Sequence, residues 1–138
     1  MTIIALTQAA SLLLAATSDG KLLMWRIPPL HHTFDNGVAL VPQFSRLQVD
    51  PRTLTGVVTT EHSVIAFNSN QIYHAPLCAL DGLKESLEFS SIAASQLLSP
   101  EESINSLVSV TDRIVIGGSL GTIILLDEEF TTISSITL

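Results

Sequence analysis

The stretch that decides the fold reads Thr-Ser-Asp-Gly-Lys-Leu-Leu-Met-Trp-Arg over residues 17–26. Its Asp19-Gly20 pair is a strong signal for a tight hairpin turn, because such turns need residues that tolerate positive φ. The four residues after Lys21 are all apolar, whereas a strand with one wet face alternates apolar and polar side chains. The stretch therefore predicts a β-hairpin whose second strand is buried on both faces.

The same pattern of two short strands, a tight polar turn and a third strand occurs three times along the chain. The turns close at Gly20, Asn70 and Gly121, which are 50 and 51 residues apart. A regular period with a hairpin in each unit indicates repeated antiparallel sheets and not βαβ units. We expect a single domain over 1–138, with blade-like units of about 1–50, 51–100 and 101–138.

The apolar pattern of the strands limits the choice of architecture further. Residues 123–126 repeat the continuous apolar run of residues 22–25, so both strands need cover on both faces. Small sheets covered on both faces by other small sheets are the arrangement of a β-propeller. A β-sandwich is the competing architecture, but it covers each sheet on one side only.

The same residues carry a resemblance to a known family. Residues 17–26 resemble the end of a WD repeat, in which an Asp-Gly turn leads to a strand that ends in Trp-Asp. Residues 121–127 resemble the same stretch, with Leu126 in the Trp position and Asp127 kept, whereas the middle unit has Ala75-Pro76 there. The chain thus resembles a divergent WD-repeat β-propeller. The resemblance implies an all-β fold of three four-stranded antiparallel blades in an open arc.

The connecting segments leave one alternative. Residues 38–47 and 131–138 are each predicted to form the outer, fourth strand of a blade. Residues 82–98 fit two structures, because Leu83 and Leu87 are spaced as in a helix while residues 87–89 suit an outer strand. If this segment is a helix, the alternative is a small α/β dimerising module of roadblock or longin type that binds a GTPase or motor subunit.

Composition excludes several classes of partner. Six basic against thirteen acidic residues give a net charge of -7, so no basic face is available for nucleic acid. The apolar residues 3–17 are too few to span a membrane and have no positive charge ahead of them, so we expect neither membrane insertion nor a signal peptide. The single Cys78 favours a reducing compartment, which indicates a cytoplasmic or nuclear location.

Two motifs that could carry chemistry have simpler explanations. His31, His32 and Asp35 lack the third or fourth group at the spacing that a metal site needs. The Gly-rich residues 117–122 lack the Lys of a phosphate loop and precede a strand instead of a helix. We therefore expect no catalytic residue, no cofactor and no metal, and the protein is not predicted to be an enzyme.

The number of units points to a function in assembly. Three blades are too few for a closed propeller, which has roughly four to eight. An open arc exposes the apolar faces of its first and last blades, and such patches mark interaction sites. We therefore expect a non-catalytic scaffold subunit, in which a second copy or a protein partner completes the propeller.

Partner contacts are predicted at turns and connections, where WD-like propellers commonly bind. The predicted contact residues of this polar and mostly acidic surface are Asp19, Asp50, Arg52, Asn68, Ser69, Glu101, Glu102, Ser119 and Leu120. Its charge suits a basic or mixed protein partner. Ile133 and Ile136, on the last predicted strand, offer a second possible contact along the outer edge.

Trp25 gives a test of the predicted core. At the end of an apolar strand it should be buried, so Trp25→Ala should lower the free energy of unfolding by about 3–5 kcal/mol. Chemical denaturation measures this loss. A red-shifted, freely quenched tryptophan emission from the native protein would contradict the prediction.

Overall fold

The computed structural model describes residues 3–9, 12–18, 21–26, 44–48, 54–77 and 89–138. These residues form three four-stranded antiparallel sheets, and in each sheet the strands are hydrogen-bonded in chain order. The first sheet contains β1 (Ile3–Ala9), β2 (Leu12–Thr17), β3 (Lys21–Arg26) and β4 (Phe44–Gln48). The second contains β5 (Gly56–Thr59), β6 (Ser63–Phe67), β7 (Gln71–Pro76) and β8 (Ser90–Ala93). The third contains β9 (Ile104–Val110), β10 (Arg113–Gly118), β11 (Thr122–Asp127) and β12 (Thr132–Thr137).

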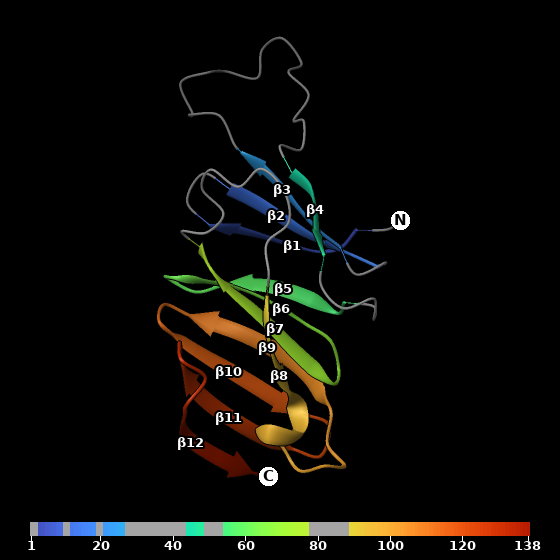
Figure 1. Ribbon diagram of the computed structural model, residues 1–138. Coiled ribbons are helices and arrows are strands. Elements are labelled where there is room, and N and C mark those ends of the chain that lie inside the picture. Colours follow the sequence, from blue (N-terminus) through green and yellow to red (C-terminus); the bar gives the residue numbers. More distant parts are fainter. Residues whose placement is uncertain (1–2, 10–11, 19–20, 27–43, 49–53, 78–88) are drawn as a thin grey trace.

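The sheets stack in chain order, from the blue first sheet to the orange and red third sheet (Figure 1). Contacts between neighbouring sheets include β1 with β5 and β5 with β9, so the sheets approach one another along their first strands. The fourth strands β4, β8 and β12 lie at the opposite edge of each sheet. This is the arrangement of blades around part of a ring, with no closure.

The core lies in two layers, one on each face of the second sheet. Successive side chains of a strand point to opposite faces, so the continuous apolar run of β6 serves both layers. Val64 and Ala66 pack with Leu14 and Met24 of the first sheet. Ile65 and Phe67 pack instead in a cluster with residues of the third sheet, including Ile104, Leu107, Ile114, Ile116, Ile124 and Leu126. A fully buried Ile contributes roughly 1.5–3 kcal/mol, so these layers hold the sheets together.

The predicted all-β fold of antiparallel blades is confirmed. β4 overlaps the outer strand predicted at 38–47. β12 falls within the outer strand predicted at 131–138. Within the ambiguous segment 82–98, the described part forms β8 and a short 3₁₀ helix, η2 (Ala94–Gln96). No α-helix occurs in the described ranges, so the α/β alternative is wrong for this part of the chain. Of the residues 87–89 that suited an outer strand, Phe89 directly precedes β8, which begins at Ser90, and residues 87–88 lie outside the described residues.

The three predicted turns have different physical bases. Gly121 has a φ of +93°, a conformation that side-chain-bearing residues rarely adopt. The turn after β6 is held instead by Asn68, whose Oδ1 accepts hydrogen bonds from the backbone N–H groups of Asn70 (2.9 Å) and Gln71 (2.8 Å). Gly20 lies outside the described residues, although β2 and β3 on either side of it pair antiparallel. The predicted burial of Trp25 concerns a side chain that the structure does not describe.

Gly121→Ala should destabilise the fold by about 1–3 kcal/mol, because its backbone conformation is strained for any residue with a Cβ. The Cβ itself would meet ordinary contact distances to Leu138, so the cost comes from φ and not from a clash. Chemical denaturation gives the change. The matched control is Leu120→Ala in the same turn, an exposed position where the expected change is within about 0.5 kcal/mol.

Candidate interaction surfaces

The structure brings several of the predicted contact residues to one edge of the second and third sheets. The N–H of Ile104 donates to the carbonyl of Ser69 (2.9 Å), and the N–H of Ser119 donates to the carbonyl of Ser103 (2.8 Å). The turns after β6 and β10 are therefore joined through the connection that leads into β9. Ser69, Glu101, Ser119 and Leu120 are exposed along this turn edge, which we define as residues 68–70, 101–104 and 119–121.

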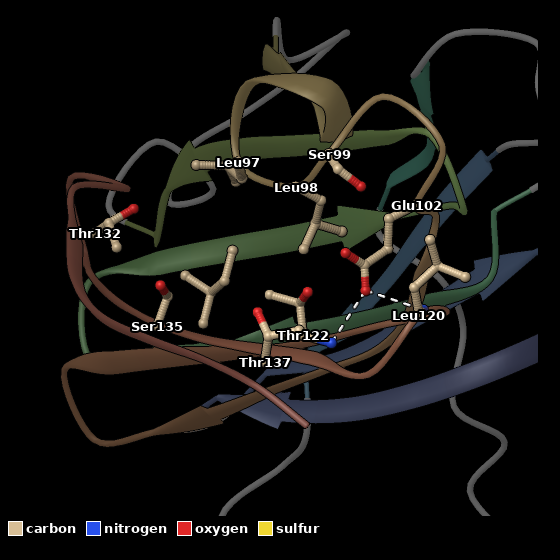
Figure 2. Close-up of a pocket in the computed structure, with 10 residues that line it drawn as sticks. Leu97, Leu98, Ser99, Glu102, Leu120, Thr122, Thr132, Ser135 and Thr137 are labelled. Carbon is tan, nitrogen blue, oxygen red and sulfur yellow. Dashed lines mark hydrogen bonds between the residues drawn. The ribbon is translucent and has the colours of Figure 1, made fainter.

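Glu102 differs from the prediction of a solvated surface charge. It is only 6% exposed, and its Oε2 accepts hydrogen bonds from the backbone N–H groups of Leu120 (3.0 Å) and Thr122 (3.1 Å). Figure 2 shows both bonds. A Cβ at Gly118 would overlap the Glu102 carboxylate, so the glycine makes room for it. The carboxylate thus holds the β10–β11 turn.

The charge of Glu102 follows from these contacts. Burial opposes ionisation, but hydrogen bonds from the side chain and backbone N–H of Thr122 and from the N–H of Leu120 favour the carboxylate and lower its pKa. Glu102 is therefore ionised at neutral pH, and it is held in place by the turn that it stabilises.

The other predicted contact residues fall into three groups. Asn68 is 5% exposed, and its side-chain oxygen serves its own turn. Ile133 and Ile136 are exposed on β12. Asp19, Asp50 and Arg52 lie outside the described residues, as do His31, His32, Asp35 and Cys78. Within the described ranges, no group of three or more His, Cys, Asp or Glu side chains could hold a metal ion.

The third sheet presents an apolar face away from the second sheet. The register places Val108, Val115 and Leu125 side by side across three strands, and Ile123 beside Ile136. Val108 is 51% exposed, Ile136 57% and Ile123 40%. With Val110, which is also exposed, these residues form what we call the open face. Their neighbours along the strands, such as Leu107, Ile116 and Ile124, point to the other face and are buried.

The corresponding face of the first sheet is more enclosed than predicted. Leu6, Ala15 and Leu23 are paired in one row across β1, β2 and β3. Leu6 is 61% exposed, but Ala15 and Leu23 are buried. Among the side chains that the structure describes, the expected exposed apolar face is therefore found on the third sheet and not in this row of the first.

A pocket of about 430 Å³ lies between the segment that follows η2 and the strands β11 and β12 of the third sheet. Figure 2 shows the side chains that surround it. They come from the segment after β8, from the turn edge and from β11 and β12, and are Leu97, Leu98, Ser99, Glu102, Leu120, Thr122, Ile124, Thr132, Ser135 and Thr137. We call it the outer pocket. Its volume is within the range of ligand sites, about 300–1,000 Å³.

At the edge opposite the turn edge, hydrogen bonds join the second and third sheets. They were not predicted from the sequence. The N–H of His62 donates to Glu128 Oε1 (3.1 Å), and His62 Nδ1 lies 2.8 Å from Glu128 Oε2. The N–H of Glu61 also donates to the carbonyl of Thr111 (3.0 Å). His62 and Glu128 are 66 positions apart in the sequence, so no local pattern links them. His62 lies in the β5–β6 turn and Glu128 in the β11–β12 turn, which are not equivalent turns of their sheets, so the repeat does not suggest the pair either.

The contact between His62 and Glu128 shifts the pKa values of both side chains. The hydrogen bond to Glu128 and its negative charge raise the pKa of His62 above 6.5. Hydrogen bonds from the side chains of Thr60 and His62 lower the pKa of Glu128, against the effect of burial. The two shifts are consistent with an ion pair when His62 is protonated.

Three stacked antiparallel sheets, each in chain order and joined along their first strands, define a β-propeller arc. The fold is that of a partial, WD-like β-propeller. No protein-family model matches the sequence, and no curated protein matches it. The described chain has no helix long and apolar enough to cross a membrane.

Solved structures support this assignment. Sqt1 of Saccharomyces cerevisiae matches with a TM-score of 0.67 and 10% identity, over 99% of this chain and 35% of that chain. The WD40 β-propeller domain of Doa1 matches at 0.63 and 11%, over 99% and 40%. The N-terminal domain of Nup159 matches at 0.64 and 19%, over 98% and 34%. The chain thus spans about a third to two fifths of the structures that it resembles, and the likeness shows the fold.

The His62–Glu128 pair predicts a pH-dependent stability. Because the pKa of His62 is raised in the folded state, its contribution is full below the unfolded value of 6.5 and is lost as the pH rises through the folded value. It is also lost at acid pH, as the pH falls through the lowered pKa of Glu128, below 4.5. The difference in melting temperature between the native protein and His62→Gln should therefore be largest between about pH 4.5 and 6.5.

Thermal melts across pH 4–9 measure this difference. Ser95→Ala, which removes no titratable group, should give a constant difference over the same range. A His62→Gln difference that grows above pH 7 would contradict the assigned pair.

Proposed function

We propose that this chain is a non-catalytic scaffold subunit that binds other proteins, an incomplete WD-like propeller completed by a second copy or by a partner. The observation that carries the proposal is the open face of the third sheet. Val108, Val110, Ile123 and Ile136 are exposed there, next to the half-buried Val115 and Leu125. A face of this kind is typical of an interaction site.

The chemistry of the open face matches that of the buried faces. Within the arc, the covered faces present mostly aliphatic side chains, chiefly Leu, Val and Ala between the first two sheets and Ile and Leu between the second and third. Full burial of one Val or Ile contributes roughly 1.5–3 kcal/mol. Association costs about 4–15 kcal/mol in lost translational and rotational freedom, so several such side chains acting together are needed to offset it. The open face supplies six, which supports a sheet-like partner over an incidental contact.

The polar residues support binding more than catalysis. One carboxylate oxygen of Glu102, Oε2, and the side-chain oxygen of Asn68 both accept hydrogen bonds from backbone N–H groups of turns. Ser119 likewise accepts a hydrogen bond from the N–H of Ser103 (3.0 Å). These groups therefore shape the surface. One similar structure contains Dbp5 bound to Nup159 and Gle1, which is in keeping with a role in protein assembly. A cytoplasmic or nuclear location belongs to the same proposal.

The turn edge is proposed as a second contact for a basic or mixed partner. Ser69, Glu101, Ser119 and Leu120 are its exposed members, and Asp19, Asp50 and Arg52 belong to the same prediction. Glu102 and Asn68 are buried behind this edge, where their side chains hold its turns by hydrogen bonds. A charge reversal that tests the contact therefore belongs at Glu101, because reversal at Glu102 would disrupt the turn itself.

Equilibrium sedimentation tests the completion of the propeller. The native chain should self-associate or co-purify with a partner, and Val108→Lys should weaken that association at least tenfold, because a charge would be buried in an apolar contact. Ser95→Lys, on the exposed surface of η2, is the matched control and should leave it unchanged. A native chain that stays monomeric at micromolar concentration and co-purifies with no partner contradicts the proposal.

A further inference from the structure

The outer pocket has two walls of different character. Leu97 and Leu98, which follow η2, form an apolar wall on the side of the second sheet. The opposite wall belongs to β12 and carries the hydroxyl groups of Thr132, Ser135 and Thr137. Figure 2 shows the two walls on either side of the space, with Glu102 at one end. A pocket with one apolar and one hydroxyl-bearing wall suits a chain with mixed side chains.

Glu102 gives the pocket a negative charge. Among the described residues that line it, Glu102 is the one charged group. Its Oε2 is held by two backbone N–H groups, and the side chain is more than nine-tenths buried. A carboxylate has two oxygens with about four acceptor positions, so Glu102 can accept further hydrogen bonds from a ligand. A cation is the complementary ligand group.

The edge of β12 offers backbone groups beside the pocket. The N–H of Leu138 donates to the carbonyl of Gly121 (3.0 Å), which makes these two a hydrogen-bonded pair. Because such pairs alternate along an antiparallel ladder, the N–H and C=O groups of Ser135 and Thr137 point away from β11. β12 is the last strand of its sheet, and no described strand pairs with its outer edge. This edge can accept an added strand.

We propose that the outer pocket and the edge of β12 together bind an extended peptide segment of a partner protein, with a Lys or Arg side chain directed to Glu102. A strand added beside Ser135 and Thr137 would direct alternate side chains to the face that lines the pocket. Thr137 and Thr122 lie between that strand and Glu102, so a long side chain is needed to reach the carboxylate. This inference rests on the proposed function, because it names the chemistry of one partner contact.

A random heptapeptide library displayed on phage tests the site directly. Selection on the immobilised chain should enrich one Lys or Arg with β-branched or apolar residues two positions away. The most enriched sequence, made as a fluorescent peptide, should bind in fluorescence anisotropy. Its Kd should rise when the basic residue is replaced by Ala, by about tenfold or more, since hydrogen bonds to charged groups are the stronger class. Selection without basic enrichment, or of acidic peptides, overturns the proposal.

Two variants of the chain locate the contact. Glu102→Gln keeps an oxygen acceptor for the turn but removes the charge, and it should weaken binding about tenfold. Glu101→Gln, the same change at the exposed neighbour, should not. If Glu102→Gln fails to fold, as judged by its thermal melt, Ser135→Lys serves instead, because it places a competing cation in the pocket. Unchanged peptide affinity in the folded variant refutes the site.

Val108→Lys separates this inference from the proposed function. The open face and the outer pocket lie on opposite faces of the third sheet, so this variant should lose blade association and keep peptide binding. Association without peptide binding would overturn the pocket alone, whereas peptide binding without association would overturn the completed propeller alone.

Discussion

The structure depends on one constraint, which is that the second sheet must be covered on both faces. Four consecutive apolar residues of β6, Val64 to Phe67, are buried and alternate between its two sides. A half-covered sheet would expose every second one of these side chains to water. The first and third sheets supply the cover, so the order of the blades follows from this strand. The third sheet also carries a continuous apolar run, at residues 123–126, but only one of its faces is covered within the arc.

Polar contacts fix how the sheets meet at their two edges. On one edge, the buried carboxylate of Glu102 ties the connection into β9 to the β10–β11 turn. On the other, His62 in the second sheet contacts Glu128 in the third. Apolar packing is non-directional and does not by itself set the angle between blades. These hydrogen bonds are directional, so they constrain how the second and third sheets meet.

The two proposed contact surfaces both result from this arrangement. The open face of the third sheet is broad and apolar, which suits another sheet. The outer pocket is small and carries a fixed negative charge at Glu102, which suits a single extended segment. They lie on opposite faces of one sheet, so both can be occupied at once. In the proposed function, the open face would join a large partner and the outer pocket would recognise a short segment.

The sequence by itself determined the hairpins, the three-fold repeat and the apolar faces, because turn residues and strand periodicity act over a few neighbouring residues. It also determined that β12 would lie at an edge, as its β-branched, half-polar pattern indicates. The tertiary structure decided that Glu102 is buried and Glu101 exposed, although the two are adjacent and chemically alike. It also decided that His62 contacts Glu128 and that β12 and the segment after η2 line a pocket. These outcomes depend on how one sheet is placed against the next, and such contacts between residues far apart in sequence leave no local pattern.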